Sequence, residues 1–125
     1  FVVSDKSFIT SHGYNSSYFI THTITLSMGD YTIPPVHDYA SKVDIPLLMY
    51  SATQDCIDPP AQNSELDYNL STSNCKVYFE IVGGCHCYFA QPDQGCYNTQ
   101  DKCGANPTIT MQQQQNITIE YVVPW

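Results

Sequence analysis

The sequence predicts an α/β fold with a mostly parallel sheet and flanking helices, and three features of its second half support that prediction. Residues 45–51 (IPLLMYS) are a continuous apolar run, which is typical of a strand covered on both faces. Residues 76–82 (KVYFEIV) are a second β-branched and aromatic run, which ends at Gly83-Gly84. The order strand, helix, strand, loop, helix after residue 45 is that of an α/β unit.

The first 44 residues carry weaker signals. Residues 1–10 are predicted to contain one or two short strands, and residues 11–15 are predicted to form a turn. Residues 22–28 (HTITLSM) alternate in polarity and predict a strand whose threonines, together with His22, face solvent. A short helix is expected over residues 37–43.

The segment between the two strong strands predicts a helix over residues 61–68, because Asp58-Pro59-Pro60 places proline where helices begin. Asp58 itself is best interpreted as a cap of that helix, with a metal ligand or a catalytic acid as the other possibilities. Residues 88–107 are rich in turn formers and cysteine, and we expect a loop there.

The C-terminal segment predicts a final helix. Thr110 and Gln113 have the spacing of a capping box, and the helix would run to about Val123. The β-branched residues 117–119 leave a strand possible at this point. On a helix, the four glutamines at 112–115 would form a solvated face.

Composition limits the function. The chain has 125 residues, enough for one domain, and 42% of them are hydrophobic, enough for a packed core. Its four basic residues are all lysines, and the net charge is −8. Nucleic acids and anionic membranes bind clustered basic residues, so neither is an expected partner. No apolar run is long enough to span a bilayer.

Six cysteines and three sequons predict an oxidising, extracellular environment. The sequons make Asn15, Asn69 and Asn116 candidate sites for N-linked glycans. No signal peptide is visible at Phe1, so we expect a mature, processed or fragmentary chain.

Disulfides are the expected use of the cysteines, because two of them flank a single histidine and no Cys-x-x-Cys spacing suits zinc. We therefore expect neither a metal site nor a cofactor. The most economical pairing joins Cys56 to Cys75 and leaves the other four to staple one loop, although other pairings remain possible. The six cysteines are Cys56, Cys75, Cys85, Cys87, Cys96 and Cys103.

Two candidate catalytic residues follow the two strong strands. Asp55 comes after the first strand, and His86 comes after the Gly83-Gly84 corner that ends the second. Functional groups gather at the carboxyl ends of parallel strands, so the two side chains should meet at one edge of the sheet. A carboxylate that orients an imidazole is the arrangement of a general base.

The segments IPLLMYSATQDCIDPPAQNSELDYN, CKVYFEIVGGCHCYFAQ and QQQQNITIEYVVPW resemble the C-terminal portion of secreted α/β-hydrolases of the dienelactone hydrolase and polyester hydrolase (cutinase) branch. The family's Asp-x-x-x-Pro segment matches residues 55–59, and its Gly-x-His corner matches residues 84–86. The resemblance covers residues 45–125. It implies that residues 1–125 are a single domain, the C-terminal half of an α/β-hydrolase-type fold.

The resemblance also implies a serine nucleophile in a Gly-x-Ser-x-Gly elbow upstream of the acid. Ser11 and Gly13 match that motif, but Ile9 stands at the first glycine. A glycan on Asn15 would lie beside this site. If Ser11 marks the elbow, the earlier strands and the loop that donates one oxyanion-hole N–H come from elsewhere.

Two functions follow. The first, which the degenerate elbow favours, is a secreted, non-catalytic glycoprotein derived from a hydrolase, which assembles with itself or with the missing N-terminal half into a complex or filament. The alternative is a serine esterase that hydrolyses carboxylic esters. In it Ser11 attacks the ester, His86 accepts the proton and Asp55 orients the imidazole.

Overall fold

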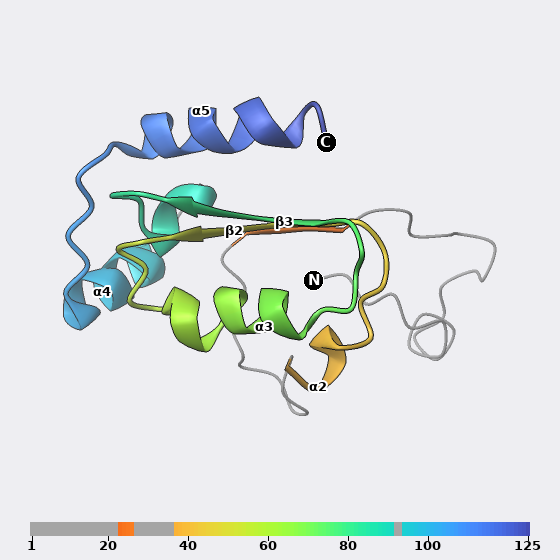
Figure 1. Cartoon of the computed structure of the whole chain (residues 1–125). Helices are drawn as coiled ribbons and strands as arrows, with labels where there is room; N and C mark the ends of the chain where they lie inside the picture. The colour runs from red at the N-terminus through yellow and green to blue at the C-terminus, as the bar shows by residue number, and fades with distance from the viewer. Residues whose placement is uncertain (1–22, 27–36, 92–93) are drawn as a thin grey trace, which may run out of the picture.

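The computed structural model describes residues 23–26, 37–91 and 94–125. These residues form a three-stranded parallel sheet with helices on both faces (Figure 1), which confirms the predicted α/β class. The strand and the turn predicted within residues 1–15 lie outside the described residues.

The sheet contains β1 (Thr23–Leu26), β2 (Leu47–Ala52) and β3 (Lys76–Ile81), with β2 in the centre. β2 pairs in parallel with β1 on one side and with β3 on the other. All six residues of β2 are buried, as its continuous apolar sequence predicts for a central strand covered on both faces.

β1 is a strand, as expected, but its two faces are reversed. Thr23 and Thr25 are buried, whereas Ile24 and Leu26 are 38% and 43% exposed. The expectation that the threonines face solvent is therefore wrong. Threonine is β-branched like valine and isoleucine, and such side chains pack well on the buried face of a pleated sheet. His22 lies outside the described residues.

Helices cover the sheet in two layers. α2 (His37–Ala40) and α3 (Ser64–Leu70) lie on one face, and α5 (Met111–Val122) lies on the other (Figure 1). A short 3₁₀ helix, η1 (Pro60–Gln62), precedes α3. Both helices predicted before β3 are present: α2 begins at His37 as predicted but ends three residues early, and α3 lies two to three residues later than the predicted 61–68.

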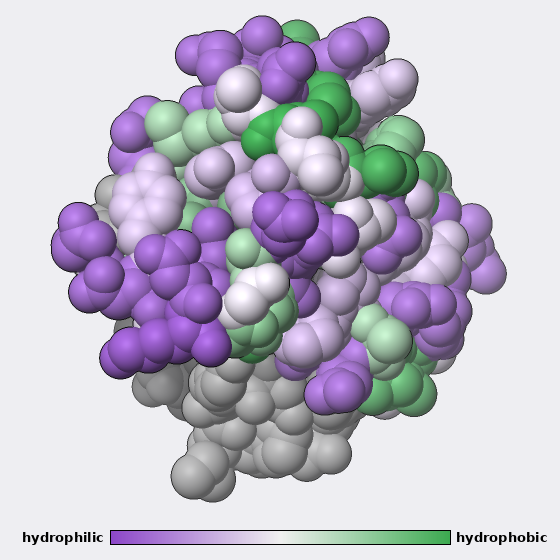
Figure 2. Space-filling view, turned by 90° about the vertical axis from the view of Figure 1, so that its left-hand side faces the viewer, coloured by the Kyte–Doolittle hydropathy of each residue, from purple (hydrophilic) through white to green (hydrophobic). Residues whose placement is uncertain are grey.

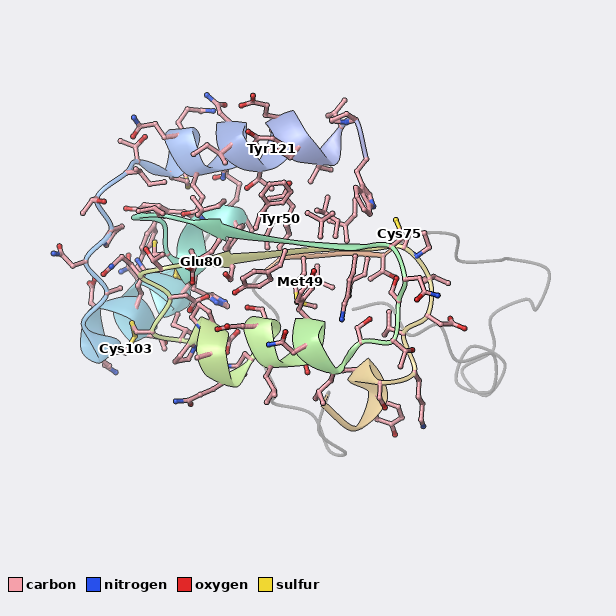
Figure 3. All side chains as sticks on the ribbon, viewed as in Figure 1. Met49, Tyr50, Cys75, Glu80, Cys103 and Tyr121 are labelled. Atoms are coloured by element: carbon pink, nitrogen blue, oxygen red, sulfur yellow. A yellow bond between two sulfur atoms is a disulfide. The ribbon has the colours of Figure 1, made fainter. Side chains whose placement is uncertain are left out.

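The main apolar core lies between the sheet and α5. Leu48, Tyr50 and Ile81 are buried there against partly buried residues of β3 and α5. Tyr50 stacks on Phe79 with ring centroids 5.3 Å apart, and Phe79 packs on Tyr121 of α5 at 4.8 Å. Figure 3 shows Tyr50 and Tyr121 on this side of the sheet and Met49 on the other, so alternate residues of β2 serve both layers.

The loop expected over residues 88–107 is largely helical instead. It contains η2 (His86–Phe89), which begins just before it, and α4 (Gln94–Cys103), a helix of ten residues. The prediction failed because local propensity is weak here and disulfides hold the segment. α5 is confirmed as a helix, and Thr110 and Gln113 form the predicted capping box at its start.

Candidate active site

β2 and β3 end at the same edge of the sheet, and hydrogen bonds join the two loops that follow them. The Thr53 N–H donates to the Ile81 carbonyl at 3.1 Å, and the Thr53 hydroxyl accepts from the Gly83 N–H at 2.9 Å. The Gln54 N–H donates to the Gly84 carbonyl at 2.9 Å. These bonds hold the two loops side by side next to α4, at the left in Figure 1.

Asp55 and His86 meet at this edge. Asp55 Oδ2 lies 3.0 Å from His86 Nδ1, and the Asp55 side chain has no exposed surface. Its other oxygen, Oδ1, accepts the backbone N–H groups of Ile57 at 3.1 Å and Asp58 at 2.7 Å. The predicted proximity of acid and histidine is confirmed, and the carboxylate is held in one orientation; the catalytic role remains a prediction.

Asp58 contributes a second carboxylate to the site. It is 5% exposed, and its Oδ2 lies 3.5 Å from His86 Nδ1. The prediction that Asp58 caps a helix is wrong, because Pro59 is the N-cap of η1 and Asn63 is that of α3. Its side chain turns toward the histidine instead.

These carboxylates set the proton affinity of the imidazole. The hydrogen bond to Asp55 raises the pKa of His86 above its ordinary value, and the negative charges of Asp55 and Asp58 act in the same direction. Partial burial opposes this shift. The His86 side chain remains 26% exposed, so the ring lies at the surface of the site with its Nδ1 edge toward the acids.

The conformation of the Gly83-Gly84 corner places His86 next to Asp55. Gly83 has φ +77°, and a Cβ on it would overlap the Thr108 hydroxyl. A Cβ on Gly84 would overlap the side-chain amide of Gln114. The Thr108 N–H donates to the Gly83 carbonyl at 2.9 Å, which ties the corner to the segment before α5.

Two disulfides lie next to the site, and they differ from the expected pairing. Cys56, which follows Asp55, pairs with Cys103, and Cys87, which follows His86, pairs with Cys96. The expected bond between Cys56 and Cys75 is wrong. Cys56 follows the carboxyl end of β2 and Cys75 precedes the amino end of β3, so in a parallel sheet the two are about 20 Å apart. Figure 3 shows Cys75 and Cys103 at opposite ends of the sheet.

Cys75 and Cys85 are unpaired, which corrects the expectation that all six cysteines form disulfides. Cys75 is exposed. Cys85 is fully buried, and burial raises the pKa of its thiol. A buried thiol with a raised pKa is a poor nucleophile, so Cys85 is not a candidate for the chemistry at this edge.

Gln100 of α4 and Gln114 of α5 are the two residues at the site that the sequence interpretation missed. Gln114 was expected on a solvated face but is 0% exposed, and Gln100 is 4% exposed. The signal for Gln114 was its helical spacing, which places it on the same face as Ile117 and Thr118. No comparable signal exists for Gln100, because it lies in a segment expected to be a loop.

The remaining predicted residues are dispersed. Ser11 and Asn15 lie outside the described residues. Asn69 and Asn116 are exposed, on α3 and α5 respectively, and thus on opposite faces of the sheet.

Figure 2 views the end at which β2 and β3 terminate. Hydrophilic residues cover most of this end, and hydrophobic ones gather toward α5.

Within residues 23–26, 37–91 and 94–125, no group of three or more His, Cys, Asp and Glu side chains could hold a metal ion. In the same ranges, no helix has both the length and the apolar character needed to cross a bilayer.

Comparisons with known proteins add little. No family model and no curated protein matches the chain. A solved structure that it resembles is the monoacylglycerol lipase of Paleococcus ferrophilus, with 23% sequence identity and a TM-score of 0.39. The match covers 53% of this chain and 25% of the lipase, so it spans about a quarter of the length of that protein.

Proposed function

We propose that this chain contributes the acid and the histidine of a serine esterase that hydrolyses carboxylic esters, with Ser11 as nucleophile, His86 as general base and Asp55 as the orienting acid. The observation that carries the proposal is the 3.0 Å contact between Asp55 Oδ2 and His86 Nδ1. It occurs where two consecutive parallel strands end, which is where such folds place their reacting groups.

The chemistry follows from that contact. With Nδ1–H donated to Asp55, the neutral imidazole has its lone pair on Nε2, which can accept the proton of a serine hydroxyl. The hydroxyl oxygen attacks the ester carbonyl, and Nε2 returns the proton to the departing alcohol. Water then attacks the acyl-enzyme by the same route and releases the carboxylic acid. Asp55 holds the imidazole through Nδ1 and stabilises the imidazolium that forms.

The buried position of Asp55 supports this role. A buried carboxylate is costly unless it is hydrogen-bonded, and Asp55 has partners on both oxygens within its own loop and on His86. A turn-forming aspartate needs only the two backbone N–H groups, so the additional bond to His86 is the functional part of the arrangement.

Ester turnover tests the proposal. Hydrolysis of p-nitrophenyl butyrate is measured for the full chain, for Ser11→Ala and for His86→Ala, with Ser7→Ala as a matched control. We expect both active-site variants to lose at least about 100-fold in kcat and the control to retain wild-type turnover. A fluorophosphonate probe should label Ser11 in the wild type, as located by peptide mass. Equal turnover of Ser11→Ala and wild type would contradict the mechanism.

The second candidate function is extracellular assembly, and the exposed face of β1 favours it. Ile24 and Leu26 are exposed on a strand that lies at the sheet edge within the described residues. Edge strands pair readily with a second chain, and a head-to-tail contact of this kind can propagate into a filament. In this alternative the partner is a second copy of the chain.

Light scattering tests assembly with a matched pair of variants. Ile24→Lys/Leu26→Lys should dissociate the large species, whereas Leu66→Lys/Leu70→Lys on α3 should not, because those leucines have similar exposure but lie away from the edge. A wild-type chain that is monomeric at all concentrations contradicts assembly.

Secretion and N-glycosylation belong to both candidates. Expression in a secretory eukaryotic host should yield a product whose electrophoretic mobility shifts on glycosidase treatment. That shift should disappear in a variant with Gln at positions 15, 69 and 116.

A further inference from the structure

We propose that Gln100 and Gln114 are positioning residues, which hold the main chain on either side of His86 and thereby set the imidazole against Asp55. The inference deepens the proposed function and rests on it, since positioning matters for catalysis only if His86 is the general base. The geometry that supports it concerns the main chain of Cys85 and Cys87, the two neighbours of His86.

Gln114 binds the main chain of Cys85, the residue before His86, with both ends of its amide. Its Oε1 accepts the Cys85 N–H at 2.9 Å, and its Nε2 donates to the Cys85 carbonyl at 2.9 Å. The side chain is fully buried, and the absence of a side chain at Gly84 makes room for it. A two-point amide contact fixes the orientation of the backbone as well as its position.

Gln100 binds the residue after His86. Its Oε1 accepts the Cys87 N–H at 3.1 Å, and the side chain is almost fully buried. Gln100 belongs to α4, whose Cys96 and Cys103 are disulfide-bonded to Cys87 and Cys56. The helix that supplies this acceptor is therefore covalently anchored to both loops of the site.

Burying two amides needs a reason, because an unpaired buried amide costs about 1–3 kcal/mol. Both amides form hydrogen bonds to the main chain of the residues that flank His86. The two glutamines come from different helices, α4 and α5. Such supporting contacts hold a catalytic side chain in register, where a displacement of about 1 Å can lower the rate by about 100-fold.

Methionine substitutions test the inference, because methionine is close to glutamine in size and carries no charge. The variants are Gln114→Met and Gln100→Met, with Gln112→Met as the matched control. Gln112 lies on α5 but is exposed, and its Nε2 donates to Asn116 Oδ1 at 2.8 Å. The measurements are the pKa of His86 by NMR of its ring protons, kcat and KM for p-nitrophenyl butyrate, and the thermal midpoint.

We expect Gln114→Met and Gln100→Met to lower the pKa of His86, because the ring loses part of its contact with Asp55. Their kcat should fall by about 10-fold or more, and KM should stay within about 2-fold. Gln112→Met should leave the pKa of His86, kcat and KM unchanged. If Gln114→Met fails to fold, the pKa of His86 and the kcat of Gln100→Met test the inference.

The result that overturns the inference is a folded Gln100→Met or Gln114→Met variant with a lower thermal midpoint but the wild-type pKa of His86 and the wild-type kcat. That pattern would assign the glutamines to stability alone. The NMR readout does not need turnover. If the wild type shows no esterase activity but the pKa of His86 still falls in the variants, the proposed function fails while the positioning role stands.

Discussion

Asp55 is held by contacts that come mostly from its own loop. One carboxylate oxygen accepts two backbone N–H groups from residues 57 and 58, and the other reaches His86. The first two contacts are local and form as soon as the loop turns, whereas the third requires β2 and β3 to be paired. The orientation of Asp55 is therefore set by its own loop, whereas its contact with His86 depends on the pairing of β2 with β3.

The raised pKa of His86 leads to a prediction about stability and pH. A histidine whose folded pKa lies above the unfolded value stabilises the fold below the unfolded pKa, and this contribution is lost as pH rises through the folded pKa. The difference in free energy of unfolding between wild type and His86→Gln should thus be larger at about pH 5.5 than at about pH 8.5.

Urea titrations at the two pH values measure that difference. The groups that face the His86 ring in the described residues are Asp55 and Asp58, and Asp55→Asn should remove most of the pH dependence. A difference that is equal at both pH values would show that the ion pair does not form in solution.

Gly83 and Gly104 give a second prediction, since both have positive φ but only Gly83 is crowded. Gly104→Ala should cost about 1–2 kcal/mol, the penalty of the left-handed conformation alone, because its Cβ would meet no atom within 4 Å. Gly83→Ala should cost about 1–3 kcal/mol more through overlap with the Thr108 hydroxyl. Chemical denaturation gives both values, and equal costs would refute the role assigned to Thr108.

Asp55 and His86 could be predicted from sequence because each follows a strong strand, and parallel strands end at a common edge. The two glutamines could not be predicted in the same way. The helical spacing of Gln114 with Ile117 and Thr118 indicates its face, but nothing local predicts that its amide binds Cys85. Gln100 has no such spacing signal, and its partner Cys87 lies in a separate element.

Among the elements, β2 and α4 are the two extremes of predictability. β2 is buried along its whole length, so its residue types alone identify it. α4 is mostly exposed, and its sequence, QGCYNTQDKC, has few residues that favour helix. The disulfides that anchor α4 depend on the sheet. The predicted parallel sheet already places Cys56 and Cys75 at opposite ends of the strands. The predicted fold is therefore enough to exclude the expected Cys56–Cys75 disulfide.

The two disulfides should contribute differently to stability. The chain-entropy model gives about 4 kcal/mol for the Cys56–Cys103 bond, with a separation of 47 residues, and about 2.5 kcal/mol for Cys87–Cys96, with a separation of 9. The Cys56→Ser/Cys103→Ser variant should therefore lose more free energy of unfolding than Cys87→Ser/Cys96→Ser. Urea denaturation of both variants measures the order, and the reverse order would mean that native contacts outweigh chain entropy.

For the whole molecule, stability should be unevenly distributed. β2 is hydrogen-bonded on both sides and buried on both faces, so its amides can exchange with solvent only when the fold opens as a whole. α4 has exposed flanks and is attached to the fold mainly by its two disulfides and the Gln100 contact, so it should open by local fluctuation.

Native-state hydrogen exchange distinguishes these two kinds of opening. The opening free energies of β2 amides should equal the global free energy of unfolding from urea titration, and those of α4 should be lower and nearly independent of low urea concentrations. Breaking the disulfides should lower the values for α4 while β2 continues to match the new global stability. If α4 were as protected as β2 in the wild type, the helix would have to be covered by more than the described contacts. The acid–histidine pair would then rest on a larger packed structure than the sheet edge and the two cross-links.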